Sequence, residues 1–159
     1  MSAAPAVDAQ DTRSQWHALS EDVVRAYEEG RYQDGITLAE QALQLAQQAL
    51  GPRDPDTLAS MNTLAFLYAS QGGDGEAEPL YTQALALRRE LLGEQHPDTI
   101  ISMDNLAALH DSQGRYGEAE PLYAQAPGAQ PRGPRRAASA YHHVRPQQHV
   151  QPRCPRQGG

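Results

Sequence analysis

Apolar residues recur at helical spacing through the middle of the chain. One stripe has members three or four positions apart, which lie on one side of an α-helix, and consists of Met61, Leu64, Ala65 and Tyr68. A second stripe with the same spacing follows after a short break and consists of Ala77, Leu80, Tyr81, Ala84, Leu87 and Leu91. The pattern predicts two consecutive helices, each with one face turned towards a common core.

Glycine and polar residues mark the expected ends of these two helices. Gly72 and Gly93 follow the stripes, and glycine tolerates the left-handed backbone with which helices commonly close. After Pro55, either Asp56 or Thr57 is expected to be the N-cap of the first helix, because its side-chain oxygen can accept a bond from a free amide. The two helices therefore form an antiparallel hairpin.

The hairpin pattern returns 42 residues later. Residues 55–57, Pro-Asp-Thr, recur at 97–99, and residues 76–81, Glu-Ala-Glu-Pro-Leu-Tyr, recur at 118–123. Weaker matches at the same offset indicate a degenerate copy over residues 14–54, so three units are expected over 14–54, 55–96 and 97–126. One hairpin cannot bury both of its faces, and its neighbours must therefore stack against it. The sequence predicts an all-α fold of antiparallel helix hairpins stacked as a short right-handed solenoid.

The residues that recur in these units resemble the tetratricopeptide repeat. The family spacing is present as Met61-x-x-Leu64-Ala65-x-x-Tyr68 followed by Ala77-x-x-x-Tyr81. The 42-residue period and the run Leu-Gly-x-x-His-Pro-Asp-Thr at residues 92–99 resemble the kinesin-light-chain subclass, whose second helix is longer than usual. The resemblance is specific over residues 55–126 and weaker over 14–54. It implies a scaffold that binds an unidentified protein or peptide.

In that family, the first helix of each unit lines a concave groove that receives the partner peptide. Carried onto the matching positions, the resemblance implies a groove face made of Asn62, Phe66, Ala69 and Ser70 in one unit and Asp104, Asn105, Ala108, Asp111 and Ser112 in the next. The family often has two adjacent asparagines at this face, whereas each unit here has one. The alternative interpretation is a polar face that only contacts solvent.

Charge is divided unevenly along the chain. Residues 1–126 carry 20 acidic residues against 7 arginines, whereas residues 127–159 carry 6 arginines and no acid. An acidic body repels phosphate, which argues against nucleic acid as the main partner. Residues 127–159 are rich in proline and arginine, and their composition predicts a disordered tail, as it does for residues 1–13. Nucleic-acid binding by the tail is the alternative function.

The repeat stops inside the second expected helix of the third unit, at Pro127, which lies 42 residues after Leu85. Proline inside a helix predicts that the third unit loses its last turns, which would leave Leu106, Leu109 and Leu122 poorly covered. Self-association through this uncapped C-terminal end is therefore expected. Because a shifted reading frame from residue 127 can encode residues expected of a fourth unit, a further hypothesis is a truncated, frameshifted fragment of a longer repeat protein without independent function.

The sequence contains no constellation that points to catalysis. The tail contains four residues of types that can bind a metal, namely His142, His143, His149 and Cys154. Their spacing fits no motif of a structural zinc site. There is no glycine-rich phosphate loop and no nucleophile placed beside a base, so no enzyme, metal or cofactor is predicted. No apolar run is long enough to cross a membrane and the N-terminus lacks the signal-peptide pattern, which predicts a cytoplasmic protein with no membrane partner.

Overall fold

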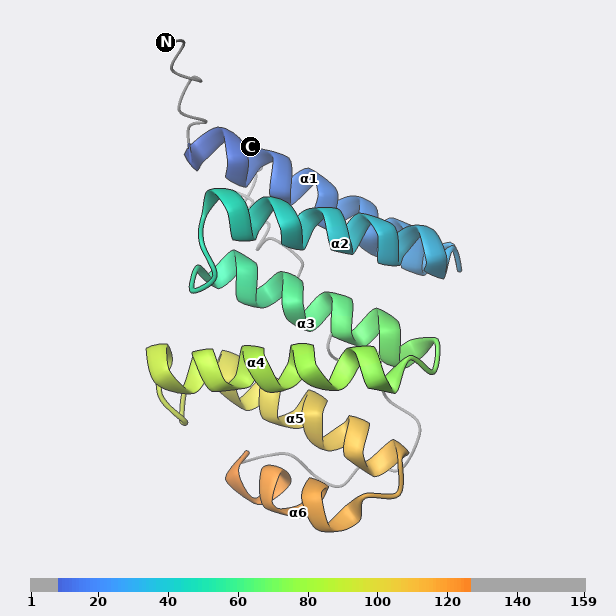
Figure 1. The fold of residues 1–159 in the computed structure, drawn as a ribbon, viewed down its shortest axis with the longest axis vertical. Coiled ribbons are helices and arrows are strands. Elements are labelled where there is room, and N and C mark those ends of the chain that lie inside the picture. Colours follow the sequence, from blue (N-terminus) through green and yellow to red (C-terminus); the bar gives the residue numbers. More distant parts are fainter. Residues whose placement is uncertain (1–8, 127–159) are drawn as a thin grey trace, which may run out of the picture.

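The computed structural model describes residues 9–126, and within that range the chain forms six α-helices and no β-strand (Figure 1). The helices are α1 (Ala9–Glu28), α2 (Tyr32–Ala49), α3 (Pro55–Ser70), α4 (Asp74–Leu92), α5 (Pro97–Ser112) and α6 (Tyr116–Gln125). They follow one another along the long axis in chain order, from α1 at the top of Figure 1 to α6 at the bottom. The predicted all-α solenoid of stacked hairpins is confirmed. The predicted tail, residues 127–159, lies outside the described residues.

Asp54 and His96, which are 42 residues apart, cap the first helices of the second and third units. Oδ1 of Asp54 accepts a hydrogen bond from the amide of Asp56 at 3.0 Å, and Nδ1 of His96 accepts one from the amide of Asp98 at 3.2 Å. The prediction that Asp56 or Thr57 is the N-cap of α3 is therefore wrong. Proline is well placed at the first helical position, where no amide is needed, so the helix begins immediately after Asp54.

Helix α1 begins at Ala9, whereas the sequence predicted disorder up to residue 13. Thr12 is fully buried, and the guanidinium of Arg13 contacts the carboxylates of Asp54 at 2.8 Å and Asp56 at 3.1 Å. These contacts attach the first turns of α1 to the start of α3. Local composition could not indicate them, because the partners are more than forty residues away in the chain.

Small residues allow the helices of a unit to approach closely. Ala65 of α3 and Ala77 of α4 are fully buried, and Tyr81 fills the space beside them. Burial raises the pKa of the Tyr81 hydroxyl above its ordinary value. Tyr68 is half-buried, and its hydroxyl donates to the carboxylate of Glu40 on α2 at 2.6 Å. Tyr81 therefore packs in the core beside residues of its own unit, whereas Tyr68 also contacts the preceding unit.

The last helix is short, as proline at position 127 predicts. α6 has 10 residues, compared with 19 in α4. Leu106, Leu109 and Leu122 were expected to be poorly covered because the helix is short. This expectation is wrong for Leu106 and Leu109, which are buried, and Leu122 is half-buried. Both buried leucines lie on α5, which packs between α4 and α6 and so has cover on two sides. From α4 to residue 126, the exposed large apolar side chains are instead Leu91 and Leu92, at the end of α4, and Tyr116, at the start of α6.

Candidate functional site

A groove of about 290 Å³ lies along α1 and the first half of α3, and we call it the α1–α3 groove. Helix α1 contributes Trp16, His17 and Glu21, and α3 contributes Asp56, Ala59 and Thr63. Arg88 of α4 and Asp98 of α5 also line it, so the groove reaches the junction between the second and third units. Its walls therefore come mainly from the first helices of the units.

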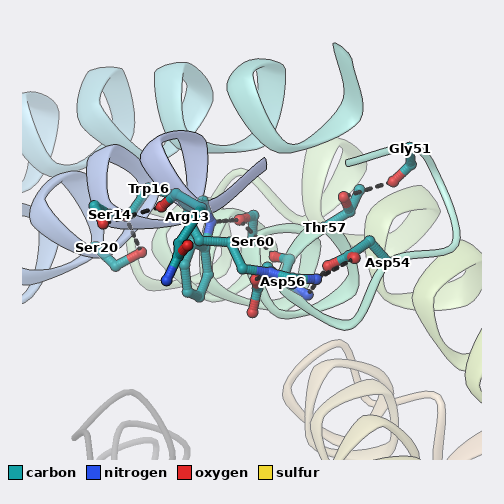
Figure 2. Close-up of polar contacts among 10 residues, drawn as sticks. Arg13, Ser14, Trp16, Ser20, Gly51, Asp54, Asp56, Thr57 and Ser60 are labelled. Atoms are coloured by element: carbon teal, nitrogen blue, oxygen red, sulfur yellow. Dashed lines mark hydrogen bonds and ion pairs between the residues drawn. The ribbon is translucent and has the colours of Figure 1, made fainter. Parts of the chain in front are cut away.

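A buried hydrogen bond joins the two walls of the groove. Nε1 of Trp16 donates to Oγ of Ser60 at 2.6 Å, and this hydroxyl in turn donates to the backbone carbonyl of Asp56 at 2.9 Å (Figure 2). Within α1, the hydroxyl of Ser20 donates to the backbone carbonyl of Trp16 at 2.9 Å. Trp16 is 8% exposed, so the indole is held in place as part of the groove wall.

Charged side chains surround the N-terminal end of α3. Figure 2 shows Arg13 reaching from α1 to Asp54 and Asp56, and both ion pairs are 3.1 Å or shorter. The hydrogen bond to Asp56 and the nearby negative charges raise the pKa of Arg13 above its ordinary value. Because these groups are partly exposed, the ion pairs contribute more to the position of α1 than to stability.

The junction between the second and third units is built around Ser102, which is the repeat equivalent of Ser60. Its hydroxyl oxygen accepts from Nδ2 of Asn62 at 3.1 Å and from Nη1 of Arg88 at 2.8 Å. Nη1 of Arg88 also donates to the backbone carbonyl of Asp98 at 3.0 Å. Burial lowers the pKa of the Arg88 guanidinium and the charge of Asp98 acts in the opposite direction, but an arginine keeps its proton at neutral pH.

The predicted groove residues lie on the expected helices but outside the α1–α3 groove. Asn62 and Phe66 are buried, the first against Ser102 and the second with its ring 5.4 Å from the ring of Tyr27. Ala69 is half-buried and Ser70 is exposed. In the third unit, the half-buried positions are Asp104, Asn105 and Asp111, and the exposed ones are Ala108 and Ser112. Peptide contact by these nine residues stays a prediction.

Sequence reasoning missed the polar residues that form the groove. Asp56 and Ser60 recur as Asp98 and Ser102 at the 42-residue offset, and this identity of polar positions was the available signal. Trp16 and Glu21 lie in the degenerate first unit, and Arg88 corresponds to Ala46 one unit earlier, so no repeat column indicated them.

The described part of the chain lacks two other kinds of site. Across residues 9–126, no three His, Cys, Asp or Glu side chains are grouped so that they could hold a metal ion. None of the helices in this range has both the length and the apolar character needed to cross a membrane. The histidines and the cysteine considered as metal ligands, residues 142–154, lie outside the described residues.

The sequence profile of the tetratricopeptide repeat matches residues 25–90 and 73–126, which together cover more than half of the chain. The protein belongs to the tetratricopeptide repeat family. A search of curated proteins found no match.

Solved structures of kinesin-light-chain type have the same fold. One is BtubC (BKLC) from P. vanneervenii, with a TM-score of 0.69 and 22% identity over 73% of this chain and 46% of that one. Another is the kinesin light chain of Podosopora anserina with nearly identical TPR-like repeats, with a TM-score of 0.66 and 29% identity over 71% of this chain and 54% of that one. This chain therefore spans about half the length of these proteins, and its repeats are of the kinesin-light-chain type.

Proposed function

We propose that this protein is a scaffold that binds an extended segment of another protein in the α1–α3 groove, with no chemical turnover and no cofactor. The observation that carries the proposal is a groove whose two walls are joined by the buried hydrogen bond from Trp16 to Ser60 and whose lining residue Arg88 is held by a buried hydrogen bond to Ser102. A site held in this way is largely preformed, so little ordering has to accompany binding. Membership of a family of interaction scaffolds supports the same function.

The partner segment would continue along the same helices beyond the groove. The nine residues predicted from the family resemblance follow on α3 and α5, and the exposed ones among them are Ser70, Ala108 and Ser112. We infer a protein partner rather than nucleic acid, because acidic side chains outnumber arginines in the repeat units. We also place the protein in the cytoplasm, without a membrane partner.

Selection from a library of random peptides tests this function. Peptides displayed on phage are selected on the full chain, and their affinities are then measured through the fluorescence of Trp16, the single tryptophan of the chain. Ala59→Arg places a long side chain in the groove, and Ala86→Arg places the same side chain on an exposed position of α4 as a matched control. We expect Ala59→Arg to abolish binding and Ala86→Arg to preserve it. If no peptide is enriched, or if both variants bind like the wild type, the groove is not the site.

A further inference from the structure

Arg88 is the exception among the arginines of the described chain. Residues 9–126 contain seven arginines, and six of them have a carboxylate oxygen within 3.9 Å. Arg88 has none in this range, although it is the buried one, with 7% of its surface exposed. Burial of a charge is costly unless an opposite charge or hydrogen bonds compensate it. Within residues 9–126, the buried charge of Arg88 is not paired with a carboxylate, and it is compensated only in part.

Among residues 9–126, the hydrogen bonds of Arg88 use only one of its three nitrogens. Nη1 donates to Ser102 and to the carbonyl of Asp98, and both bonds fix the direction of the guanidinium. Neither Nε nor Nη2 donates to an atom of the described residues, and neither is sealed from the surface, in contrast to Nε of the neighbouring Arg89. Arg88 lines the α1–α3 groove, so these donors are available to a ligand there. Nε and Nη2 form the pair of parallel donors that binds a carboxylate in bidentate fashion.

We propose that Arg88 binds one carboxylate of the peptide that occupies the α1–α3 groove. This inference rests on the proposed peptide binding and adds a chemical class to it. The carboxylate belongs to an aspartate or glutamate side chain or to the C-terminus of the partner segment. Its oxygens accept from Nε and Nη2, while Ser102 holds Nη1 on the other side of the guanidinium.

The other charges of the groove limit this recognition to a single carboxylate. Glu21, Asp56 and Asp98 line the same space, and of these Asp56 is already paired with Arg13. A run of acidic residues in the ligand would be repelled by Glu21 and Asp98. A cationic residue next to the carboxylate would be attracted to them. The expected segment therefore has one acid and neighbouring arginine or lysine, with small apolar residues against Ala59.

Three synthetic peptide pools with the same random flanking positions test the proposal on the full chain. The first pool has one glutamate and an amidated C-terminus, the second has glutamine and a free C-terminus, and the third has glutamine and an amidated C-terminus. We expect the best ligands of the first or second pool to bind about tenfold or more tightly than those of the third. Tighter binding in the first pool assigns a side-chain carboxylate, and tighter binding in the second assigns the C-terminus.

Variants of two adjacent arginines separate the role of Arg88 from a general charge effect. Arg88→Gln is expected to remove the preference for the carboxylate pools, and Arg88→Lys, which keeps the charge without the paired donors, to reduce it. The matched control is Arg89→Gln, because Arg89 contacts Gln125 and the sulfur of Met103 outside the groove. Should Arg88→Gln fail to fold, the comparison of the three pools on the wild type still shows whether the groove prefers a peptide with a carboxylate.

The outcomes distinguish this inference from the proposed function. Equal affinity of all three pools would overturn the role of Arg88 and leave peptide binding in the groove intact. Failure of every pool to bind would overturn both. A peptide with three consecutive glutamates that binds more tightly than its single-glutamate counterpart would contradict the limit set by Glu21 and Asp98.

Discussion

Nε1 of Trp16 lies 2.6 Å from Oγ of Ser60, and this hydrogen bond connects the first unit of the solenoid to the second. The two residues are 44 positions apart, on α1 and α3. Ser60 also donates to the backbone of its own helix, so the hydroxyl links the indole to the first turns of α3. One serine therefore sets the distance between two walls of the groove.

Ser60→Ala should destabilise the protein, because the buried indole N–H of Trp16 would lose its acceptor. An unsatisfied buried donor costs about 1–3 kcal/mol. Urea unfolding followed by the fluorescence of Trp16 measures the change. Ser14→Ala is the control, since Ser14 is an exposed α1 serine whose hydroxyl bonds only to the carbonyl four residues earlier. Equal stabilities of the two variants would show that the Trp16–Ser60 bond contributes nothing.

Ala65→Leu should disrupt the packing of α3 against α4. Ala65 is 0% exposed, and the added bulk would have to enter a close contact between two helices. Overpacking of this kind costs about 1–3 kcal/mol. Thermal unfolding measures the effect, with Ala86→Leu on the exposed face of α4 as the control. A midpoint unchanged from the wild type would place Ala65 away from the contact.

Gly35→Ala should stabilise the protein. A Cβ atom at this position of α2 would lie 3.7 Å from Cβ of Ala26 and 3.8 Å from the side chain of Leu67, which is ordinary contact. Alanine is favoured over glycine inside a helix by about 0.5–1 kcal/mol. Gly72→Ala is the opposite case, because Gly72 has a φ of +77° and a side chain there is strained. A rise in unfolding midpoint for the first variant and a fall for the second are expected.

Stability should fall as the pH rises from about 10 to about 12, in part through Tyr68. Its hydrogen bond to Glu40, together with partial burial, raises the pKa of Tyr68 to about 12. The folded state therefore holds this proton more tightly than the unfolded state does. The resulting stability is complete below the unfolded pKa and is lost as the pH passes through the folded pKa. Burial shifts the pKa of Tyr81 in the same direction.

Tyr68→Phe removes the titrating hydroxyl, so the decline in stability across this range should be shallower in the variant. Urea midpoints measured at several pH values give the slope, and tyrosinate absorbance reports the titration. Tyr116→Phe removes an exposed hydroxyl on α6 and is the matched control. A slope that is the same for Tyr68→Phe and the wild type would contradict the assignment of this proton to Tyr68.

The helices and their order were predictable because their signals are local. An apolar stripe such as Met61 to Tyr68 depends on residues three or four positions apart, and the turn at Gly72 depends on one backbone conformation. The start of α1 was predicted too late for the opposite reason. Arg13 is ordered by carboxylates of the next unit, and nothing in residues 9–13 indicates those partners.

The sequence by itself determined the repeat: a 42-residue hairpin, its glycine turns, and the early end of α6 ahead of Pro127. Only the tertiary structure decided which polar side chains meet. Trp16 reaches Ser60, and Arg88 reaches Ser102 while leaving two nitrogens free of partners among residues 9–126. These pairs join different helices across turns and units. Their geometry follows from how neighbouring hairpins stack, and that stacking is set by the fit of whole helix faces rather than by any local spacing.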